Sequence, residues 1–426
     1  MSLRAFLIGS NNIDRDSYLW NMIGSLLNAF QSVIMLMILT RTVNLYEAGL
    51  FTIAYANANL FLNIGKYGVR NFQVSDTNRQ FSFKEYNLTR YITTIAMLLV
   101  SVIYVFFAAK TNDYTSEKSM IIIWMCLFKI VDSLEDAYHG LYQQNNRLDI
   151  AGKCMTLRMF FTIIVFGVCL FVYNSLLTAL IISTIFTTIV YIVFTILTCS
   201  EFKSFYGSID KNNIVKLLKN CFPLFLGAFL AFFIGNAPKY AIDSQLNDEL
   251  QACYGFIAMP VFVIGLLNNF IFNPVIAHMS LMWNEGNKKD FFKIFKKQLL
   301  IIVALTAICE LGAFLLGIPV LSILYNTNLA PYKTELLVLL FGGGFLALSG
   351  LLVTVITIMR MQKVLSIGYI IVSVCALILS PIMVDKFAIM GASVLYLILM
   401  FLLCVMFLIP IIRHISTHNT NIVSHH

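Results

Sequence analysis

Long runs of apolar residues, each about the length of one membrane crossing, follow one another along almost the whole chain. An α-helix needs roughly 20 apolar residues to cross a bilayer, and short polar connections separate about twelve runs of that size. The cores of the predicted helices are 17–41, 48–65, 88–109, 120–139, 155–173, 176–198, 222–241, 251–277, 299–318, 335–359, 364–384 and 389–412. The pattern predicts an all-α polytopic membrane protein with about twelve transmembrane helices and no large extramembrane domain.

A long basic connection at 201–220 divides the chain into two groups of about six predicted spans. We therefore expect an N-terminal lobe at 1–200, a cytoplasmic linker at 201–220 and a C-terminal lobe at 221–426, arranged around a central cavity as in transporters built from duplicated halves. Residues 21–30 align without gaps to residues 220–229, with four identities in ten positions. This match favours a duplication, although two spans of similar composition can also agree to this extent by chance.

The composition and the position of the charges support the membrane class. Hydrophobic residues make up 59% of the chain and charged residues only 12%, which excludes an ordinary soluble domain. The net charge of +8 does not indicate nucleic-acid binding, because the basic residues gather in alternate connections, as the positive-inside rule predicts for cytoplasmic loops. The basic residues of the cytoplasmic side are Arg4, Arg15, Lys66, Arg70, Arg79, Lys84, Arg147, Lys153, Lys203, Lys211, Lys216, Lys219, Lys288, Lys289, Lys293, Lys296, Lys297, Arg360, Lys363 and Arg413. Those of the opposite side are only Arg41, Lys110, Lys118, Lys333 and Lys386, so we expect both termini in the cytoplasm.

The sequence contains no signal for processing, redox chemistry or a cofactor. The first seventeen residues carry several charges around a very short apolar patch, which does not fit a signal peptide. The nine cysteines form no CxxC pair, and we expect them to be reduced structural thiols. No P-loop or metal-binding cluster is found, and we expect neither a cofactor nor a metal nor enzymatic activity.

The fourth predicted span is unusually rich in charge on one face. The polar positions of that face are Lys129, Asp132, Asp136, His139 and Gln143, with Glu135 at its edge. Ionisable groups are costly against lipid, so the face is predicted to line a bundle interior or a wet cavity, with Lys129 and Asp132 as a neutralised pair. Asp132 and Asp136 are candidates for ion coupling. Alternatively, the span ends early and its second half is an interfacial helix in the headgroup region.

Other ionisable residues also fall inside predicted spans. Arg90 and Arg158 either bind a ligand or snorkel to the cytoplasmic surface. Lys239 precedes Asp243 by four residues, so both a structural ion pair and a ligand role remain open. Glu310 has no basic neighbour in the sequence and is a candidate proton or cation site, or else a buried acid that the fold satisfies.

Amide side chains recur in the first two predicted spans. The first span carries Asn21, Asn28 and Gln31, and the second carries Asn57, Asn59 and Asn63. Amides inside membrane helices either join neighbouring helices or line a wet path. We take Asn28 and Asn57 as candidate substrate contacts.

Two stretches of the chain carry a family resemblance. The first is Tyr-Gly-Val-Arg-Asn-Phe-Gln-Val-Ser-Asp at 67–76, and the second is Asn-Ala-Pro-Lys-Tyr-Ala-Ile-Asp at 236–243, followed by Tyr-Gly-Phe-Ile-Ala-Met-Pro at 254–260. They resemble the Wzx-type polysaccharide flippases of the multidrug/oligosaccharidyl-lipid/polysaccharide exporter superfamily. The layout of twelve spans in two lobes extends the resemblance over nearly the whole chain.

The resemblance implies a flippase of the bacterial cytoplasmic (inner) membrane. Its expected substrate is an undecaprenyl-diphosphate-linked oligosaccharide, moved from the cytoplasmic to the outer leaflet by alternating access for O-antigen, capsule or related surface polysaccharide. A diphosphate needs cationic partners, and sugars need amides or aromatic faces. Arg70 and Lys239 lie in the matched stretches, and the other candidate substrate-binding cations are Lys66, Lys129, Arg90 and Arg158. The expected partners are the lipid-linked oligosaccharide, the bilayer, a proton or sodium counter-ion and the polysaccharide polymerase machinery.

Three alternatives remain open from the sequence. A cation-coupled exporter of small amphipathic drugs from the same superfamily would depend on the intramembrane acids rather than on the cations. A membrane scaffold without transport would have little use for so many intramembrane charges. A polymerase or ligase acting in the membrane would need a large extracytoplasmic loop, and the largest connection on that side holds only about a dozen residues.

Overall fold

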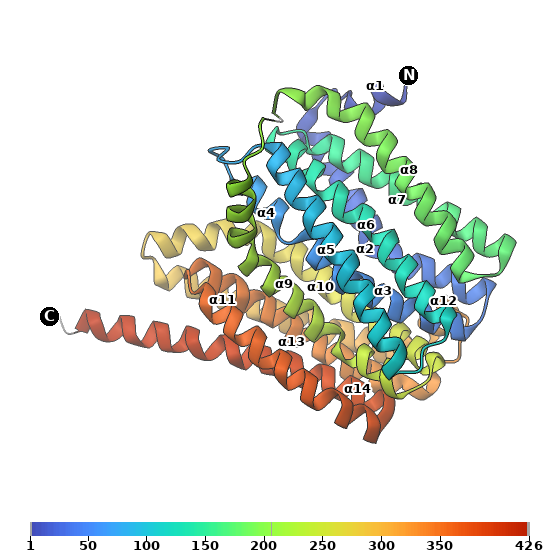
Figure 1. Cartoon of the computed structure of the whole chain (residues 1–426). Coiled ribbons are helices and arrows are strands. Elements are labelled where there is room, and N and C mark those ends of the chain that lie inside the picture. The colour runs from blue at the N-terminus through green and yellow to red at the C-terminus, as the bar shows by residue number, and fades with distance from the viewer. Residues whose placement is uncertain (1, 206, 424–426) are drawn as a thin grey trace. The chain divides into compact units, whose positions relative to one another are not determined.

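A computed structural model describes the backbone of residues 2–205 and 207–423; it also describes their side chains, except at 203–205, 266–274, 277 and 414–423. The α-helices are α1 Leu3–Ile8, α2 Ile13–Thr42, α3 Leu45–Lys66, α4 Val69–Ser75, α5 Phe83–Thr111, α6 Ser116–Gln144, α7 Leu148–Tyr173, α8 Leu176–Cys199, α9 Lys211–Gln245, α10 Asp248–Asn284, α11 Lys288–Gly312, α12 Ile318–Tyr325, α13 Lys333–Ile358 and α14 Gln362–Val423 (Figure 1). Two 3₁₀ segments, η1 Ser200–Phe205 and η3 Ala330–Tyr332, and a π-helical turn, η2 Ala313–Gly317, complete the set.

The predicted spans correspond to these helices. Nine of the twelve are α2, α3, α5 to α10 and α13, and the ninth predicted span is α11 continued through η2 into α12. The last two are the arms of α14, which are separated by a non-helical residue, Ala388. Within the described residues, eight segments are long and apolar enough to cross a bilayer, and α3, α6 and α10 are not among them. The all-α polytopic membrane class is confirmed, and α6 departs from the apolar pattern because of its charged face.

Local signals set the helix boundaries. The side chains of Asn12, Asn44 and Thr115 cap α2, α3 and α6 by accepting a backbone N–H in the first turn. Between α3 and α4, Tyr67 and Gly68 are both left-handed, with φ of 48° and 68°, so the chain changes direction within two residues.

The chain forms two compact units, one up to Phe229 and the other from Leu230. In the first unit, α2 packs along α7, α3 along α6, and α6 also contacts α5 and α8 (Figure 1). Gly152 of α7 lets α2 approach closely, because a Cβ there would lie 2.6 Å from the backbone nitrogen of Asn21. Such close packing holds membrane helices together without a hydrophobic driving force.

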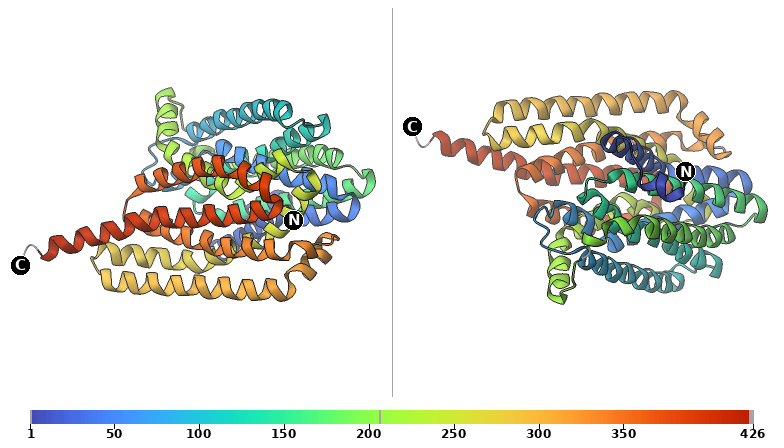
Figure 2. Two further views of the ribbon diagram at one scale, coloured as in Figure 1. Left: turned by 90° about the horizontal axis from the view of Figure 1, so that it is seen from below. Right: turned by 90° about the horizontal axis from the view of Figure 1, so that it is seen from above.

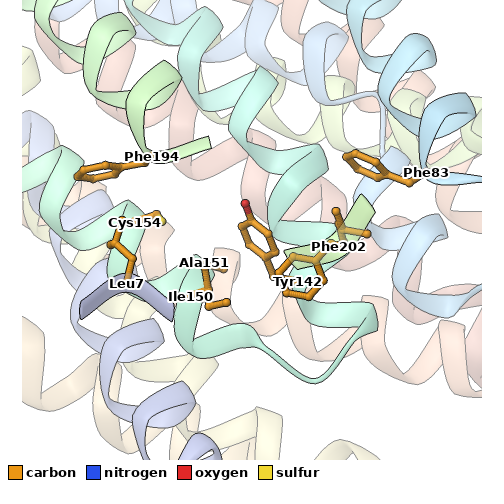
Figure 3. Packing of buried hydrophobic residues seen from close by; sticks show 9 residues of the cluster. Leu7, Phe83, Tyr142, Ile150, Ala151, Cys154, Phe194 and Phe202 are labelled. Carbon is orange, nitrogen blue, oxygen red and sulfur yellow. The ribbon is translucent and has the colours of Figure 1, made fainter. Parts of the chain in front are cut away.

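An apolar cluster lies at the end of the first unit where α6 is connected to α7. Leu7 of α1, Phe83 of α5 and Phe194 of α8 belong to it (Figure 3). Tyr142 of α6 and Phe202 of η1 have their ring centroids 5.2 Å apart. The cluster therefore attaches the N-terminal helix and the segment after α8 to the ends of the long helices.

The part of the predicted linker from 207 to 220 packs against the first unit. Glu85, which forms a capping box with Ser82 at the start of α5, accepts hydrogen bonds from the backbone of Asp210 and from the side chain of Asn213. Leu217 is buried in an apolar cluster with residues of α4 and α5. The first half of α9 is consequently part of the first unit, and the division between the units falls inside this helix.

In the second unit, α13 packs against both α14 and α10, and α10 and α11 run side by side (Figure 2). Tyr325 at the end of α12 stacks on Phe256 of α10, with centroids 4.3 Å apart. These contacts join α12 to the longer helices of its unit.

Candidate functional site

The charged face of α6 is buried inside the first unit. The helix is continuous from Ser116 to Gln144 and packs against α3, α5, α7 and α8. Glu135 and His139, in its second half, are only 6% and 4% exposed. Other helices of the first unit therefore cover the second half of α6.

Four residues of α6 and α7 form a closed group, which we call the inner cluster: Lys129, Asp132, Glu135 and Arg158. Lys129 Nζ donates to Asp132 Oδ2 at 2.9 Å and to Gln31 Oε1 of α2 at 2.8 Å. Arg158 Nη2 donates to Asp132 Oδ1 and to Glu135 Oε2, both at 2.7 Å. Their side chains are at most 9% exposed. Two cations face two carboxylates, so the inner cluster is neutral.

Further contacts tie the inner cluster to the surrounding helices. Arg158 Nη1 donates to Thr187 Oγ1 of α8 at 3.1 Å. Lys129 Nζ lies 4.8 Å from the ring centroid of Tyr55 of α3, a cation–π distance. Five helices thus meet at this group, which is how a buried charge network fixes the packing of a bundle.

A second group lies about one turn further along α6, and we call it the outer cluster: Asp136, Arg90, Arg70 and Lys66. Arg90 of α5 is fully buried and donates to Asp136 Oδ2 at 2.7 Å and to the carbonyl of Gly65 at 2.9 Å. Arg70 of α4 lies 3.4 Å from Asp136 Oδ1 and donates to Gln143 Oε1 at 2.9 Å. Its side chain is 27% exposed, which makes it accessible to a ligand.

Lys66, the last residue of α3, completes the outer cluster. It is partly exposed, and within the described part of the chain its side chain has no hydrogen bond or ion pair. It lies near enough to Asp132 and Asp136 to interact with both through its charge. The outer cluster therefore sets three cations against one carboxylate and carries a surplus of two positive charges.

Arg90 and Arg158 do not snorkel to the surface. Both guanidinium groups are buried and hydrogen-bonded to carboxylates of α6. A buried charge is tolerated when it is paired and hydrogen-bonded in this way. The direct hydrogen-bond partners of both arginines are protein groups.

A polar stripe, which we define as Tyr55, Asn59, Asn63 and Lys66, follows the partly exposed face of α3 and ends in the outer cluster. Its members are spaced i, i+4, i+8 and i+11, which places them on one side of a helix. The remaining partly exposed position between residues 48 and 66 is Ile64, on the opposite side. An aromatic ring and two amides thus lead along the helix to two cations.

The two predicted amide contacts lie in different surroundings. Asn28 of α2 is exposed, together with Ser25 one turn before it. Asn57 is completely buried, and neither polar atom of its amide has a hydrogen-bond partner among the described residues. The accessible amides of α3 are Asn59 and Asn63, which lie two residues and six residues further along.

Two predicted site residues belong to the second unit. Lys239 is partly buried in α9. Glu310 lines a cavity of about 340 Å³ between α11 and α13, next to Thr306 and Phe341, and its Oε1 atom is buried without a hydrogen-bond partner among the described residues. A carboxyl group in such apolar surroundings remains a candidate for protonation or for cation binding.

Comparison with known proteins gives a consistent assignment. Residues 15–280, more than half of the chain, match the family model described as "Polysaccharide biosynthesis protein". The chain belongs to this family. A curated relative, the capsular polysaccharide biosynthesis protein CapF of Staphylococcus aureus, is 23% identical over 385 residues, covering 87% of this chain and 92% of CapF.

Solved structures share the fold of this family member. An inward-facing multidrug resistance MATE family transporter of the MOP superfamily has a TM-score of 0.69 at 11% identity, covering 92% of this chain and 96% of the transporter. The lipid II flippase MurJ in an inward closed conformation has a TM-score of 0.67 at 12% identity, covering 92% of this chain and 87% of MurJ. The resemblance to Wzx-type polysaccharide flippases is confirmed by the family match and the curated relative, and the solved structures show the shared fold.

Several members of the site were not predicted as such from the sequence. Gln143 and Glu135 were placed on or near the charged face of α6 but were not assigned a role, and Gln31 and Thr187 were not connected to it. Gln31 lies 98 positions from its partner Lys129, and Thr187 lies 29 from Arg158. Helical spacing predicts which residues share a face, whereas partners on another helix leave no signal in a single sequence.

Proposed function

We propose that this family member is a flippase for oligosaccharides linked to undecaprenyl diphosphate, which it moves from the cytoplasmic to the outer leaflet by alternating access for surface polysaccharide synthesis. The observation that carries the proposal is the outer cluster with its surplus of two positive charges at one end of a polar stripe. A diphosphate diester has two negative charges, and guanidinium and ammonium groups are its usual partners in proteins.

The polar stripe fits the other half of such a substrate. Asn59 and Asn63 offer amides, which hydrogen-bond sugar hydroxyls, and Tyr55, whose ring contacts Lys129 and Phe51, lies at the far end of the stripe. Lys66 lies eleven positions after Tyr55, a rise of about 17 Å along the helix, which is enough for several sugar units. The cations at one end fit the diphosphate of a lipid-linked oligosaccharide, and the polar groups along the rest of the stripe fit its sugars.

The arrangement of the acids favours a flippase over a cation-coupled drug exporter. In the first unit, Asp132, Glu135 and Asp136 are each bonded to an arginine or lysine of the chain. An exporter of cationic drugs would need such acids available for the drug or the coupling ion. Glu310 remains as the candidate coupling site for a proton or sodium counter-ion.

The orientation follows the charge pattern. The outer cluster lies at the ends of α3 and α5 that face the basic connections, so we place it on the cytoplasmic side of a bacterial inner membrane, with both termini in the cytoplasm. A substrate synthesised on that side would meet the cationic cluster first. Delivery of the flipped lipid to a polysaccharide polymerase would follow on the opposite side.

The test is deletion and complementation in the native bacterium. We expect loss of the protein to leave lipid-linked repeat units in the cytoplasmic leaflet and to reduce surface polysaccharide, with rescue by the wild-type chain. Unchanged surface polysaccharide and unchanged leaflet distribution would contradict the proposal. Drug susceptibility measured in the same strains would then decide whether the exporter function replaces it.

A further inference from the structure

Arg70 is held by a neutral group as well as by a carboxylate. Its Nη2 donates to Gln143 Oε1 at 2.9 Å, whereas the distance from Nη1 to Asp136 Oδ1 is 3.4 Å. The shorter of the two contacts is therefore the one to the amide. Gln143 is partly exposed at the end of α6, on the same side as the partly exposed Arg70.

Asp136 does little to neutralise Arg70, because it is bonded more closely to Arg90. The Arg90 Nη2 to Asp136 Oδ2 distance is 2.7 Å. Arg90 is fully buried and forms no other ion pair within the described ranges. Removing a buried cation from its carboxylate is unfavourable, so Asp136 stays paired with Arg90. Most of the positive charge of Arg70 is therefore not compensated by a carboxylate.

We propose that Gln143 is a positioning residue for the diphosphate: it orients Arg70 by a hydrogen bond but leaves its positive charge available. A guanidinium has five N–H donors, and the two described contacts use two of them. The other three can bind phosphate oxygens in the bidentate way typical of arginine, and Lys66 supplies the second charge. This inference rests on the proposed function. It assigns the preference of the protein for a diphosphate over a monophosphate to the side-chain amide of Gln143.

A nearby contact of the same kind offers a matched control. Arg79 Nη2 donates to Asn145 Oδ1 at 3.1 Å, two residues beyond Gln143, and this pair is exposed. Changing either amide to its acid adds one negative charge at the same end of α6 and beside an arginine. Only the change at Gln143 adds it to the outer cluster.

The experiment compares Gln143→Glu, Gln143→Ala and Asn145→Asp with the wild-type full-length protein. Each is purified, checked for thermal unfolding temperature, and tested in two ways. Binding is measured in detergent with a fluorescent polyprenyl-diphosphate-linked disaccharide and with its monophosphate counterpart. Translocation of the same two probes is measured in proteoliposomes.

We expect Gln143→Glu to weaken binding of the diphosphate probe by about tenfold or more, because a carboxylate at this position neutralises Arg70 and repels the phosphates. Binding of the monophosphate probe should fall less, so the preference for diphosphate shrinks. Gln143→Ala should lose about threefold, since only the orienting hydrogen bond is removed. Asn145→Asp should keep the wild-type preference.

A Gln143→Glu protein that unfolds like the wild type and keeps its full preference for diphosphate would overturn the inference. An equal loss in Asn145→Asp would also overturn it, because general surface charge would then explain the effect. If the wild type binds the diphosphate probe selectively but translocates neither probe, the proposed function fails while the role of Gln143 is still decided by the binding data.

Discussion

The inner and outer clusters both set lysine and arginine side chains against acids of α6, but they differ in net charge. In the inner cluster, Lys129 and Arg158 face Asp132 and Glu135, and the group is neutral and almost fully covered. In the outer cluster, one carboxylate faces three cations, two of which are partly exposed. A closed, neutral network suits the joining of helices, whereas an open network with surplus charge suits the binding of an anion.

Cations that all lie in or beside the predicted spans therefore have two different roles, structural pairing and substrate binding. Every cation in a membrane span suggests a functional site, yet Lys129 and Arg158 have all their charge matched within the protein. Arg70 and Lys66 do not. We therefore assign structural roles to the inner cluster and substrate binding to the outer cluster, and the changes below test this division in order of expected effect.

The largest effect is expected from Arg158→Ala. It leaves Asp132 and Glu135 without their shared partner inside the bundle, and breaking a buried ion pair costs about 3–5 kcal/mol. We expect a strong fall in the amount of folded protein in the membrane and in its unfolding temperature in detergent. The control is Arg4→Ala, which removes an exposed pair with Glu201 and should change stability by less than about 1 kcal/mol.

Arg70→Ala should have the next largest effect, but on function rather than on stability. The side chain is partly exposed and its carboxylate retains Arg90, so the protein should fold. Loss of charged hydrogen bonds worth about 2 kcal/mol predicts roughly thirtyfold weaker binding of a diphosphate-linked lipid. Arg70→Lys should recover part of the binding of the diphosphate-linked lipid. A fall in folded protein similar to that of Arg158→Ala would place Arg70 in the structural network instead.

Lys66→Ala should weaken binding by about fivefold, corresponding to about 1 kcal/mol for one partly exposed charge. Titration of the diphosphate-linked lipid at several salt concentrations provides the measurement. The salt dependence should become shallower than in the wild type, because one cation no longer takes part. An unchanged affinity would show that Lys66 does not contribute to substrate binding.

Asn63→Ala should have the smallest effect, about twofold, since it removes a single neutral hydrogen bond to a sugar. The informative measurement is the difference between two probes, one with an oligosaccharide and one with the bare diphosphate lipid. Only the former should bind more weakly. Equal loss for both probes would indicate that Asn63 acts on the helix rather than on the sugar.

The sequence was sufficient for the fold class and for the charged face of α6. Apolar runs of the length of a span predict helices that match α2, α3 and α5 to α14, and the 100° advance per residue brings Lys129, Asp132 and Asp136 to one side. Both patterns depend only on residues that are close together in the sequence, so they can be recognised without knowledge of the tertiary packing. The turn at Tyr67 and Gly68, which directs Arg70 toward α6, depends on the left-handed conformation of two residues and was not predicted.

The partners of the charges could not be predicted because they lie on other helices. The snorkelling alternative for Arg90 and Arg158 was reasonable from the sequence, since both are long cations near the ends of their spans that the charge pattern predicts to be cytoplasmic. Packing of α5 and α7 against α6 buries them instead. Likewise, Asn57, Asn59 and Asn63 are similar as sequence, but only the last two reach the accessible face, because their rotation about α3 relative to its neighbours decides exposure.

The most direct measurement for the central claim is the preference of the reconstituted protein for a diphosphate-linked over a monophosphate-linked oligosaccharide lipid. The wild type and the double variant Arg70→Ala/Lys66→Ala would be compared by leaflet exchange in proteoliposomes, after their unfolding temperatures have been matched. We expect the wild type to favour the diphosphate and the double variant to lose this preference while remaining folded. An unaltered preference in a folded double variant would contradict the assignment of substrate binding to the outer cluster.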